Sequence, residues 1–335
     1  MANYLVTGGG GFLGSALSKR LASLGHSVVS LSRGVYPDLT AAGVRTERVD
    51  LTTPHTYYSH LFHGIDAVFH VAAKVDMWGP KSAFINANIV ATKNVLRCCH
   101  EQKVPVLVFT SSPSVIADGT DLKKVDESAR YPVHYDAFYP ETKAIAEKEV
   151  LAAHGNNLRT LSLRPHLIYG PGDTNLIPTI LAKAKAGKLV QIGDGTNLSD
   201  FTYIDDCVAA HIKAAEALNV NPAVGGRAYF ISQGDPVPLW EFVNKVLEMN
   251  GLQPISNAIN FRFAKALAGI VEAFAIVFRF EPPLTKFLIS EMGTSHYFDI
   301  SAAKRLLNYT PTVSVWEGLE KTRLASFPNK GVLSN

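Results

Sequence analysis

The N-terminal segment passes from a short apolar run straight into a series of glycines. Tyr4–Thr7 has the composition of a buried strand, and Gly8, Gly11 and Gly14 follow at intervals of three. Glycine at these positions permits a tight turn, close approach of a ligand to the backbone, and close packing of helix on strand. The helix expected over 15–24 directs its unpaired N–H groups and the positive end of its dipole toward this turn. The segment therefore predicts the first unit of a parallel α/β sheet and a site for the phosphates of a dinucleotide.

The alternation of strand-like and helix-like segments continues through two thirds of the chain. Six further strands are expected at Ser27–Leu31, Arg45–Val49, Ala67–Val71, Val106–Thr110, Thr160–Arg164 and Ala228–Ile231. The helices expected after them are Asn86–Cys99, Pro140–Ala153, Ile177–Ala186 and Asp205–Ala217. This order is typical of βαβ units. We predict an α/β fold, a Rossmann-type doubly wound parallel sheet with a smaller, mostly helical C-terminal substrate-binding part.

The boundary between the two parts is expected to be interleaved. Residues 1–165 are assigned to the nucleotide-binding Rossmann domain, to which 205–232 return with one more strand. Residues 166–204 and 233–335 are assigned to the substrate-binding part, in which glycine-rich loops come first and helices dominate from about Pro236 onward.

Composition excludes several functional classes. The 335 residues carry a net charge of only +3, with no basic run, so no nucleic acid partner is expected. The three cysteines, Cys98, Cys99 and Cys207, have no disulfide or zinc spacing, and the histidines are scattered, so no metal site is expected. No signal peptide pattern precedes the glycines. These features favour a cytoplasmic protein.

The end of the second predicted strand indicates which dinucleotide binds. NAD sites usually place a carboxylate there for the ribose hydroxyls, whereas this chain has Ser32 and Arg33. A guanidinium can pair with a 2′-phosphate in bidentate fashion, so NADP(H) is the predicted cofactor. Asp50 and Leu51 are expected near the adenine ring. The remaining residues expected to line the cofactor in these segments are Phe12 and Leu13 at the glycine turn and Ala72, Ala73 and Lys74 after the fourth strand.

A phenol and an ammonium lie four residues apart on a predicted helix. Tyr139 and Lys143 therefore share one helix face, and both are expected to contact the cofactor. A neighbouring cation favours the phenolate, so Tyr139 can exchange a proton with a carbonyl oxygen while hydride moves at carbon. Ser112 directly follows a predicted strand and is the candidate for holding the substrate oxygen, with Ser114 as the alternative.

These motifs together resemble the extended short-chain dehydrogenase/reductases, in the branch of the 3β-hydroxysteroid and sterol-4-carboxylate dehydrogenases. The glycine turn, the serine cluster, Tyr139–Lys143 and Leu163–Asp173 occur in the order of that family over nearly the whole chain. The resemblance implies an NADP-dependent oxidoreductase acting on a hydroxyl or ketone group, with Ser112, Tyr139 and Lys143 catalytic. It also implies that Pro165 and Ile168 contact the cofactor, and that the protein is a homodimer through the helices carrying Asn88 and Tyr139.

Other segments look like the bacterial 2-alkyl-3-oxoalkanoate reductases of long-chain olefin biosynthesis. These segments are Arg33–Pro37, Ala72–Lys74 with Trp78–Gly79, Thr110–Val115, Val190–Leu198, Tyr229–Ser232 and Pro283–Leu288. The resemblance implies reduction of the ketone of a β-keto acid with two alkyl chains, and a complex with the β-lactone synthetase and other enzymes of that pathway. Ser112 stands where related enzymes often have threonine, which retains the hydroxyl. Lys74, Trp78 and Lys286 are candidates for holding the substrate carboxylate.

One apolar stretch, 266–278, is interrupted only by Glu272 and is too short to span a bilayer. We interpret it first as a buried helix, and alternatively as a lid over an apolar substrate or a helix in peripheral contact with a membrane or a partner. Three other functions stay open. They are a hydroxysteroid or sterol dehydrogenase, an NADPH-binding sensor without turnover, and a sugar-nucleotide epimerase or dehydratase.

Overall fold

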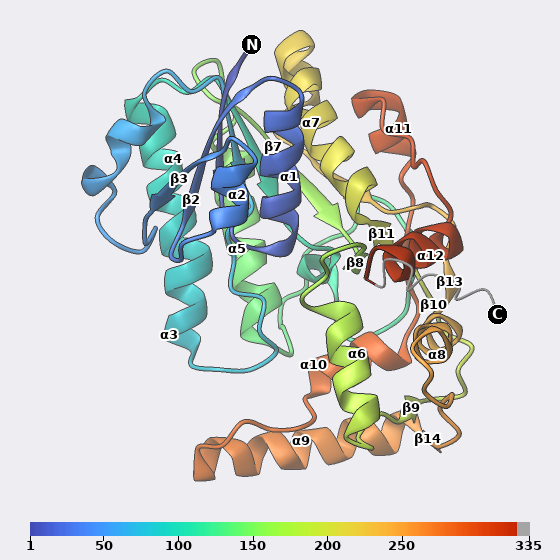
Figure 1. Ribbon diagram of the computed structural model, residues 1–335. Helices are drawn as coiled ribbons and strands as arrows, with labels where there is room; N and C mark the ends of the chain where they lie inside the picture. Colours follow the sequence, from blue (N-terminus) through green and yellow to red (C-terminus); the bar gives the residue numbers. More distant parts are fainter. Residues whose placement is uncertain (327–335) are drawn as a thin grey trace, which may run out of the picture.

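Seven parallel strands form the centre of the structure, a computed structural model that describes residues 1–326 (Figure 1). In spatial order they are β12 (Ala228–Ile231), β7 (Arg159–Pro165), β5 (Val106–Thr110), β4 (Ala67–His70), β1 (Asn3–Thr7), β2 (Ser27–Ser32) and β3 (Arg45–Arg48). They are the seven strands that the sequence predicts, with ends that differ by at most one residue. The predicted doubly wound parallel sheet is confirmed.

Helices cover both faces of this sheet. On one face lie α1 (Phe12–Ser23) and α7 (Ile204–Val220), which contact each other, and on the other lie α4 (Ala91–Glu101) and α5 (Phe138–Ala152) (Figure 1). Successive strand residues point to opposite faces, so Leu5 packs in one core cluster and Val6 in the other. Burial on both faces explains why the strands are continuous apolar runs in the sequence.

The strand order reverses direction between β1 and β4. β1 pairs with β2 on one side and with β4 on the other, so the connections from these two strands leave toward opposite faces. A crevice opens at such a switch point outside the carboxyl ends of the strands, where open α/β sheets bind ligands. The glycine turn that follows Thr7 lies at this point.

The later part of the chain combines helices with short strands. Its helices are α6 (Leu176–Lys185), α8 (Leu239–Met249), α9 (Phe261–Phe278), α10 (Lys286–Gly293), α11 (Ser301–Leu307) and α12 (Val315–Ser326). Its strands are β8 (Ile168–Tyr169), β9 (Gln191–Ile192), β10 (Leu198–Ser199), β11 (Thr202–Tyr203), β13 (Val237–Pro238), β14 (Ala258–Ile259) and β15 (His296–Phe298). The sequence analysis did not predict these strands, because most are two residues long and carry no periodic pattern.

One of the small sheets joins distant parts of the chain. β6 (Leu122–Val125) pairs in parallel with β15, and β15 also pairs with β10, which pairs with β13. A short strand that follows β5 thus belongs to the same sheet as strands of the C-terminal part. Of the two remaining α-helices, α2 (Pro37–Ala41) contacts β3 and α1, and α3 (Lys81–Phe84) contacts α5.

The interpretation of 266–278 as a buried helix was wrong. The stretch is helical and belongs to α9, but α9 runs along the base of the molecule and exposes its large apolar side chains, including Ile276 and Phe278. The apolar composition of a segment can indicate a helix, but it does not indicate which side of that helix packs against the rest of the protein. Among residues 1–326, no helix combines the length and the apolar character needed to cross a bilayer.

A buried ion pair anchors α5 to β7. Glu147 and Arg164 are both almost completely inaccessible, and Arg164 Nη2 lies 2.6 Å from Glu147 Oε1. Tyr131 Oη donates a further hydrogen bond of 2.6 Å to the same carboxylate oxygen. Because α5 carries Tyr139 and Lys143, this pair also fixes the helix that the sequence predicts to be catalytic.

We expect Glu147→Gln to lower the free energy of unfolding by about 3–5 kcal/mol, because it leaves the guanidinium of Arg164 buried without a counter-charge. The matched control is Glu149→Gln on the same helix, whose exposed pair with Lys93 is worth about 0–1 kcal/mol. Urea denaturation followed by circular dichroism measures both. Equal, small effects of the two substitutions would contradict the assigned role of the buried pair.

Candidate active site

A cavity of about 1160 Å³ opens at the carboxyl ends of the central strands. Residues that follow β1, β2, β3, β4, β5 and β7 line one side of it, and residues from α6, α8 and α10 line the other. It therefore occupies the position at which this sheet topology creates a crevice.

The structure brings most of the residues singled out from the sequence to the wall of this cavity. The lining includes Gly8, Gly11, Phe12, Leu13, Gly14, Ser32, Arg33, Asp50, Leu51, Ala72, Ala73, Ser112, Ser114, Tyr139, Lys143, Pro165 and Ile168. Their roles stay predictions, because the structure describes the chain without ligands.

Two of the predicted residues lie elsewhere. Lys74 is absent from the lining of the cavity, although Ala73, Val75 and Asp76 belong to it; its ammonium pairs with Asp76 and lies 5.1 Å from the centre of the Phe84 ring. Lys286 is also absent from the lining and pairs with Glu272 at 3.7 Å. Trp78, the third candidate for the substrate carboxylate, does line the cavity.

The glycine turn is packed too closely to accept side chains. Gly8 has φ of +72°, and a Cβ atom there would lie 2.7 Å from the Cα atom of Ala72. A Cβ atom at Gly14 would lie 2.2 Å from the carbonyl oxygen of Gly8. Gly11 precedes α1 without any side-chain cap, and the first turn of α1 contains no acidic residue. The exposed N–H groups of this helix end thus suit a phosphate.

A basic group and an aromatic ring mark the outer end of the cavity. Arg33 is exposed at the end of β2, and its carbonyl oxygen accepts a hydrogen bond of 3.1 Å from Arg48 Nε. The backbone N–H and the hydroxyl of Thr52 both donate to the Asp50 carboxylate, which holds it in a local turn and lowers its pKa. The ring of Tyr36 lies so near Gly10 that a Cβ atom there would approach it to 1.9 Å. The sequence analysis did not single out Tyr36.

Lys143 is a buried ammonium held mainly by a backbone carbonyl. Its side chain reaches from α5 to β5, where Nζ donates a hydrogen bond of 2.5 Å to the carbonyl oxygen of Thr110. Nζ also lies 4.1 Å from the centre of the Phe109 ring. Burial lowers the pKa of Lys143 to about 7, although Glu147 opposes the shift. The group is therefore poised between its charged and neutral forms near neutral pH.

Tyr139 and Ser112 form the proton-donating edge of the site. Burial raises the pKa of Tyr139, with a smaller opposing effect from its hydrogen bond with Ser112, so the phenol is neutral at neutral pH. The Oγ atom of Ser112 accepts hydrogen bonds from Ser114 N (3.2 Å) and Ser114 Oγ (2.9 Å). With both lone pairs engaged, the hydroxyl proton of Ser112 is left to donate. Ser114 therefore orients Ser112.

Asn88 links the cofactor side of the cavity to α5. It lies in a π-helical segment, η3 (Ile85–Val90), that continues α3 into α4. Its side-chain oxygen accepts a hydrogen bond of 2.7 Å from Lys74 N, and its Nδ2 donates to Thr142 Oγ1 at 3.0 Å. The helix expected at 86–99 thus begins earlier, at Lys81. It widens into a π-helical turn around Asn88, the residue that positions the loop after β4.

Two histidines and a glutamate lie together at the other end of the cavity. His166 and Glu291 line the cavity, and Glu291 Oε2 lies 4.0 Å from His166 Nε2 and 3.8 Å from His296 Nδ1. The two imidazoles lower the pKa of Glu291 although burial alone would raise it. The sequence analysis missed this cluster, because its members are far apart in the chain.

The cluster offers one ligand atom from each of three residues, within 4.8 Å of one another, and these are residue types that bind zinc. Its donor separations exceed the distance of roughly 3.4 Å between neighbouring ligands of a tetrahedral zinc site. Thr294 Oγ1 donates to the carbonyl oxygen of Ser290, so His296 Nε2 is the donor in its contact of 2.9 Å with that hydroxyl. The cluster thus places a carboxylate between two imidazoles in the cavity wall.

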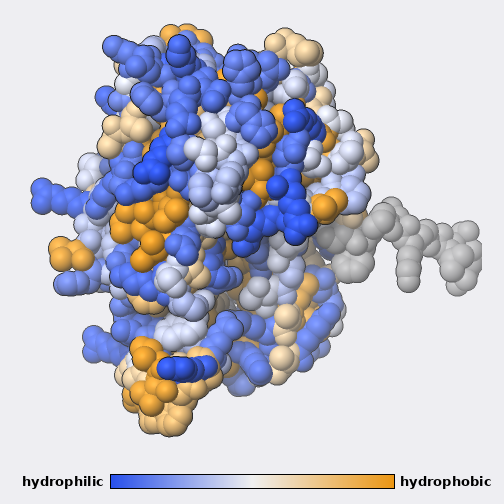
Figure 2. All heavy atoms as spheres, turned by 90° about the vertical axis from the view of Figure 1, so that its left-hand side faces the viewer, coloured by the Kyte–Doolittle hydropathy of each residue, from blue (hydrophilic) through white to orange (hydrophobic). Residues whose placement is uncertain are grey.

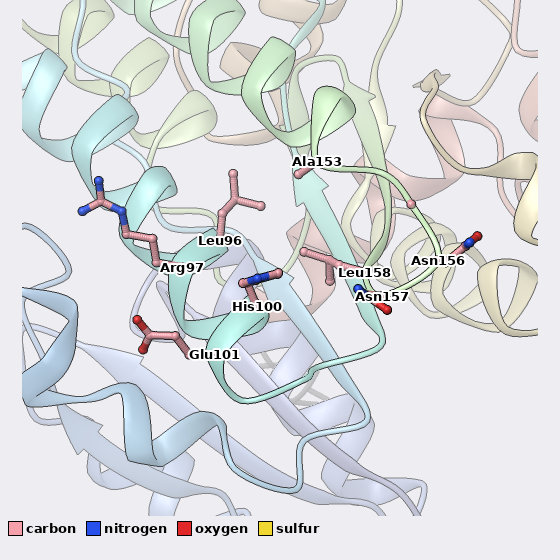
Figure 3. A pocket seen from close by; sticks show the side chains of 9 residues that line it. Leu96, Arg97, His100, Glu101, Ala153, Asn156, Asn157 and Leu158 are labelled. Atoms are coloured by element: carbon pink, nitrogen blue, oxygen red, sulfur yellow. The ribbon is translucent and has the colours of Figure 1, made fainter.

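A second, smaller hollow of about 480 Å³ lies between the end of α4 and the loop that follows α5 (Figure 3). Leu158 lies on the side of the hollow opposite Arg97 and Glu101, and the charged ends of these two side chains point away from it. It borders the beginnings of β5 and β7, the opposite edge of the sheet from the large cavity. It therefore lies at the edge where open α/β sheets do not bind ligands.

The buried ammonium predicts an unusual dependence of stability on pH. The lysine pKa is about 7 in the folded protein and about 10.4 in an unfolded chain, so between these values the unfolded state binds more protons and stability rises with pH. We expect Lys143→Met to stabilise the ligand-free protein at pH 7 and below, with the difference vanishing as pH approaches the unfolded value.

Thermal unfolding of both proteins across this pH range measures the effect. Lys148→Met, at an exposed position of the same helix, is the control and should show no such trend. A Lys143→Met variant that is less stable than the wild type at every pH would show that the ammonium is not strained.

Comparison with solved structures agrees with the topology. The chain resembles MoeE5 in complex with UDP-glucuronic acid and NAD, with 26% identity and a TM-score of 0.75, over 97% of this chain and 99% of that one. A structure described as gox2253 shares the fold at a TM-score of 0.78 and 24% identity, over the full length of both chains.

Curated relatives narrow the comparison. A 2-alkyl-3-oxoalkanoate reductase of Stenotrophomonas maltophilia is 42% identical over 96% of this chain and 98% of its own. The enzyme of the same name from Shewanella oneidensis is 38% identical over 96% and 86%. A decarboxylating sterol-4-alpha-carboxylate 3-dehydrogenase of Mus musculus is 33% identical over 95% and 89%. The 3-beta hydroxysteroid dehydrogenase/isomerase family matches residues 5–262, and the chain is an oxidoreductase that belongs to this family.

Proposed function

We propose that this protein is an NADPH-dependent reductase of long-chain 2-alkyl-3-oxoalkanoic acids. It converts the 3-keto group into the 3-hydroxyl group, reversibly, as a step of long-chain olefin biosynthesis. The observation that carries the proposal is the convergence of Ser112, Tyr139 and Lys143 on one cavity that also contains the glycine turn. The two reductases of this name, at 42% and 38% identity over nearly the whole chain, support the choice of substrate.

The residues of the cavity fit a nicotinamide dinucleotide. The N–H groups at the start of α1 suit the pyrophosphate. The space beside Gly11 is open to a ligand, because a Cβ atom at this position would meet only the carbonyl oxygen of Gly8, at 3.3 Å. Asp50 and Leu51 would flank the adenine, and Ala72 and Ala73 the middle of the molecule. The solved relative with 26% identity is described with NAD. When bound, the nicotinamide supplies the hydride.

Ser112, Tyr139 and Lys143 have separate tasks in this proposal. Ser112 turns its hydroxyl proton from Tyr139 to the substrate ketone oxygen and so holds that oxygen beside Tyr139. Tyr139, which is neutral at neutral pH, gives its proton to that oxygen as the alkoxide develops. Lys143 lies one helical turn after Tyr139, and its ammonium, when charged, favours the phenolate left behind. In the reverse direction the phenolate takes the proton from the hydroxyl.

The part of the cavity beyond these residues is strongly apolar. Its lining there includes Leu176, Ile180, Leu189, Leu239, Phe242, Val243, Pro282, Pro283, Phe287, Leu288 and Met292. Each methylene group of an alkyl chain that enters such a lining gains about 0.8 kcal/mol. A substrate with two long alkyl chains therefore obtains most of its binding energy here, and its orientation from the polar groups at Tyr139.

A sterol or hydroxysteroid dehydrogenase is the second candidate. The observation that favours it is the 33% identity to the sterol-4-alpha-carboxylate dehydrogenase, which covers 95% of this chain. The same three residues would serve a rigid polycyclic alcohol. Activity with the two classes of substrate distinguishes the candidates.

The deciding experiment is reduction of NADP⁺ by the purified protein with a long-chain 2-alkyl-3-hydroxy acid. This direction avoids β-keto acids, which decarboxylate readily. A 3β-hydroxysteroid, and NAD⁺ in place of NADP⁺, are measured in parallel. Turnover of the branched acid with NADP⁺ supports the proposal, and turnover of the steroid alone contradicts it.

We expect Tyr139→Phe to reduce turnover by about 10²–10⁴-fold, because it removes the group that exchanges the proton. NADPH binding, measured by fluorescence titration, should stay within a small factor of the wild type. The matched control is Tyr135→Phe, which removes a hydroxyl that donates 2.9 Å to the carbonyl oxygen of Val115, away from the cavity. Comparable losses in both variants would argue against a catalytic role for Tyr139.

We expect Arg33→Ser to weaken NADPH selectively. Loss of a charge-assisted hydrogen bond costs about 1.5–3 kcal/mol, which corresponds to roughly 10–150-fold in KM for NADPH, with KM for NADH unchanged. Arg45→Ser removes another exposed guanidinium near this edge, one that pairs with Glu47, and should alter neither value. An equal effect of Arg33→Ser on both cofactors would remove the basis for preferring NADPH.

A further inference from the structure

Helix α9 is packed with its small residues inward and its large residues outward. The side chains that it buries are Ala264, Ala268, Glu272 and Ala275. The large apolar side chains that it and the next turn expose are Phe263, Ile270, Phe274, Ile276, Val277, Phe278 and Phe280, and we name these seven the α9 ridge. Ile276, Val277 and Phe278 each expose about two thirds or more of their surface (69%, 72% and 67%). A surface helix in water normally has the opposite arrangement.

The α9 ridge projects from the body of the molecule. In Figure 1, α9 runs along the base, and its C-terminal end extends past the helices above it. Figure 2, which faces that end, shows hydrophobic residues gathered at the base. Contiguous exposed apolar patches of this kind mark surfaces that meet another apolar phase.

Two arginines stand at the ends of the ridge, Arg262 before Phe263 and Arg279 between Phe278 and Phe280, and the exposed Glu281 follows. Arg262 and Arg279 are exposed at the two ends of α9, and neither forms an ion pair within residues 1–325. The charges between them turn inward: Lys265 Nζ donates to the carbonyl oxygen of Gly119, and Glu272 pairs with Lys286. The outer face is therefore apolar with a guanidinium at each end, the pattern of a helix that lies in the interface of an anionic membrane.

We propose that the α9 ridge docks onto the surface of a bilayer that contains anionic phospholipids. The apolar side chains enter the boundary between headgroups and acyl chains, while Arg262 and Arg279 meet lipid phosphates. The helix lies on the membrane and does not cross it, since it is too short to span a bilayer.

A second copy of the chain is the less favourable occupant of this surface. In a two-fold symmetric pair of α9 helices, Arg262 of one copy would lie near an arginine of the other, and only the exposed Glu281 beside Arg279 could offset the repulsion. Anionic lipid neutralises both arginines. A single convex helix also presents a narrow surface to a protein partner, whereas lipid can surround it.

The ridge is continuous with the mouth of the large cavity. Glu281, Pro282 and Pro283, which follow it directly, belong to the cavity lining. Docking through α9 therefore brings this part of the cavity to the bilayer surface. If the proposed function holds, an alkyl substrate could pass from the bilayer into the cavity, and this idea rests on that function. The docking of α9 does not depend on it.

The test is co-sedimentation of the full-length protein with vesicles of phosphatidylglycerol and, separately, of phosphatidylcholine. We expect binding to phosphatidylglycerol, weakened at least tenfold in a Phe274→Ser/Val277→Ser variant. The matched control is Val133→Ser/Val220→Ser, which removes two exposed apolar side chains elsewhere and should bind like the wild type. Arg262→Gln/Arg279→Gln should lose about fivefold per arginine.

Three results would overturn the proposal. They are binding that is unaffected by Phe274→Ser/Val277→Ser, binding that is equal for the two lipids, and no vesicle binding at all. In the last case, a wild-type dimer in analytical ultracentrifugation that dissociates in the same variant would assign the ridge to a second copy. Circular dichroism verifies that each variant is folded. Because the assay contains no substrate, its outcome is independent of whether the proposed reductase activity is found.

Discussion

Helix α1 can begin where it does only because two glycines, Gly8 and Gly14, leave no side chain between β1, the loop after β4 and the helix. A Cβ atom at Gly14 would collide with the carbonyl of Gly8, and one at Gly8 would collide with the backbone of Ala72. This close packing sets the position of the helix end relative to the crevice between β1 and β4. The loop after β4 is then fixed by Asn88, and Asn88 in turn contacts α5, which carries Tyr139 and Lys143. The glycine turn and the helix that carries Tyr139 and Lys143 are thus connected through the loop after β4 and Asn88.

The electrostatics of the site follow from burial rather than from paired charges. Lys143 is held by a carbonyl oxygen and an aromatic face, and both burial and this ammonium lower the pKa of His70, to about 3. His70 is therefore neutral and serves as a bridge between the hydroxyls of Thr7 and Thr92. Other charged side chains are spread around the lining, among them Arg33, Lys183 and Glu291.

The central sheet could be predicted well because its strands are buried on both faces, which leaves continuous apolar runs such as Val106–Thr110 in the sequence. The glycine turn and the Tyr139–Lys143 pair were also visible, because local spacing encodes them. His166, Glu291 and His296 could not be predicted, since only the packing of α10 and β15 brings them together. The orientation of α9 was missed for a related reason. Its composition indicated an apolar helix, but alanines and not phenylalanines face the protein.

The pairing of β6 with β15 limits how a substrate can enter. β6 follows the strand that leads to Ser112, whereas β15 follows α10, which carries Glu291 and lines the cavity. Opening the cavity by a hinge rotation of one half against the other would break this pairing and the bonds of Asp121 and Val125 to the segment around β15. The two walls of the cavity are therefore joined by backbone hydrogen bonds, and any enlargement of the cavity that keeps these bonds is confined to segments outside this small sheet.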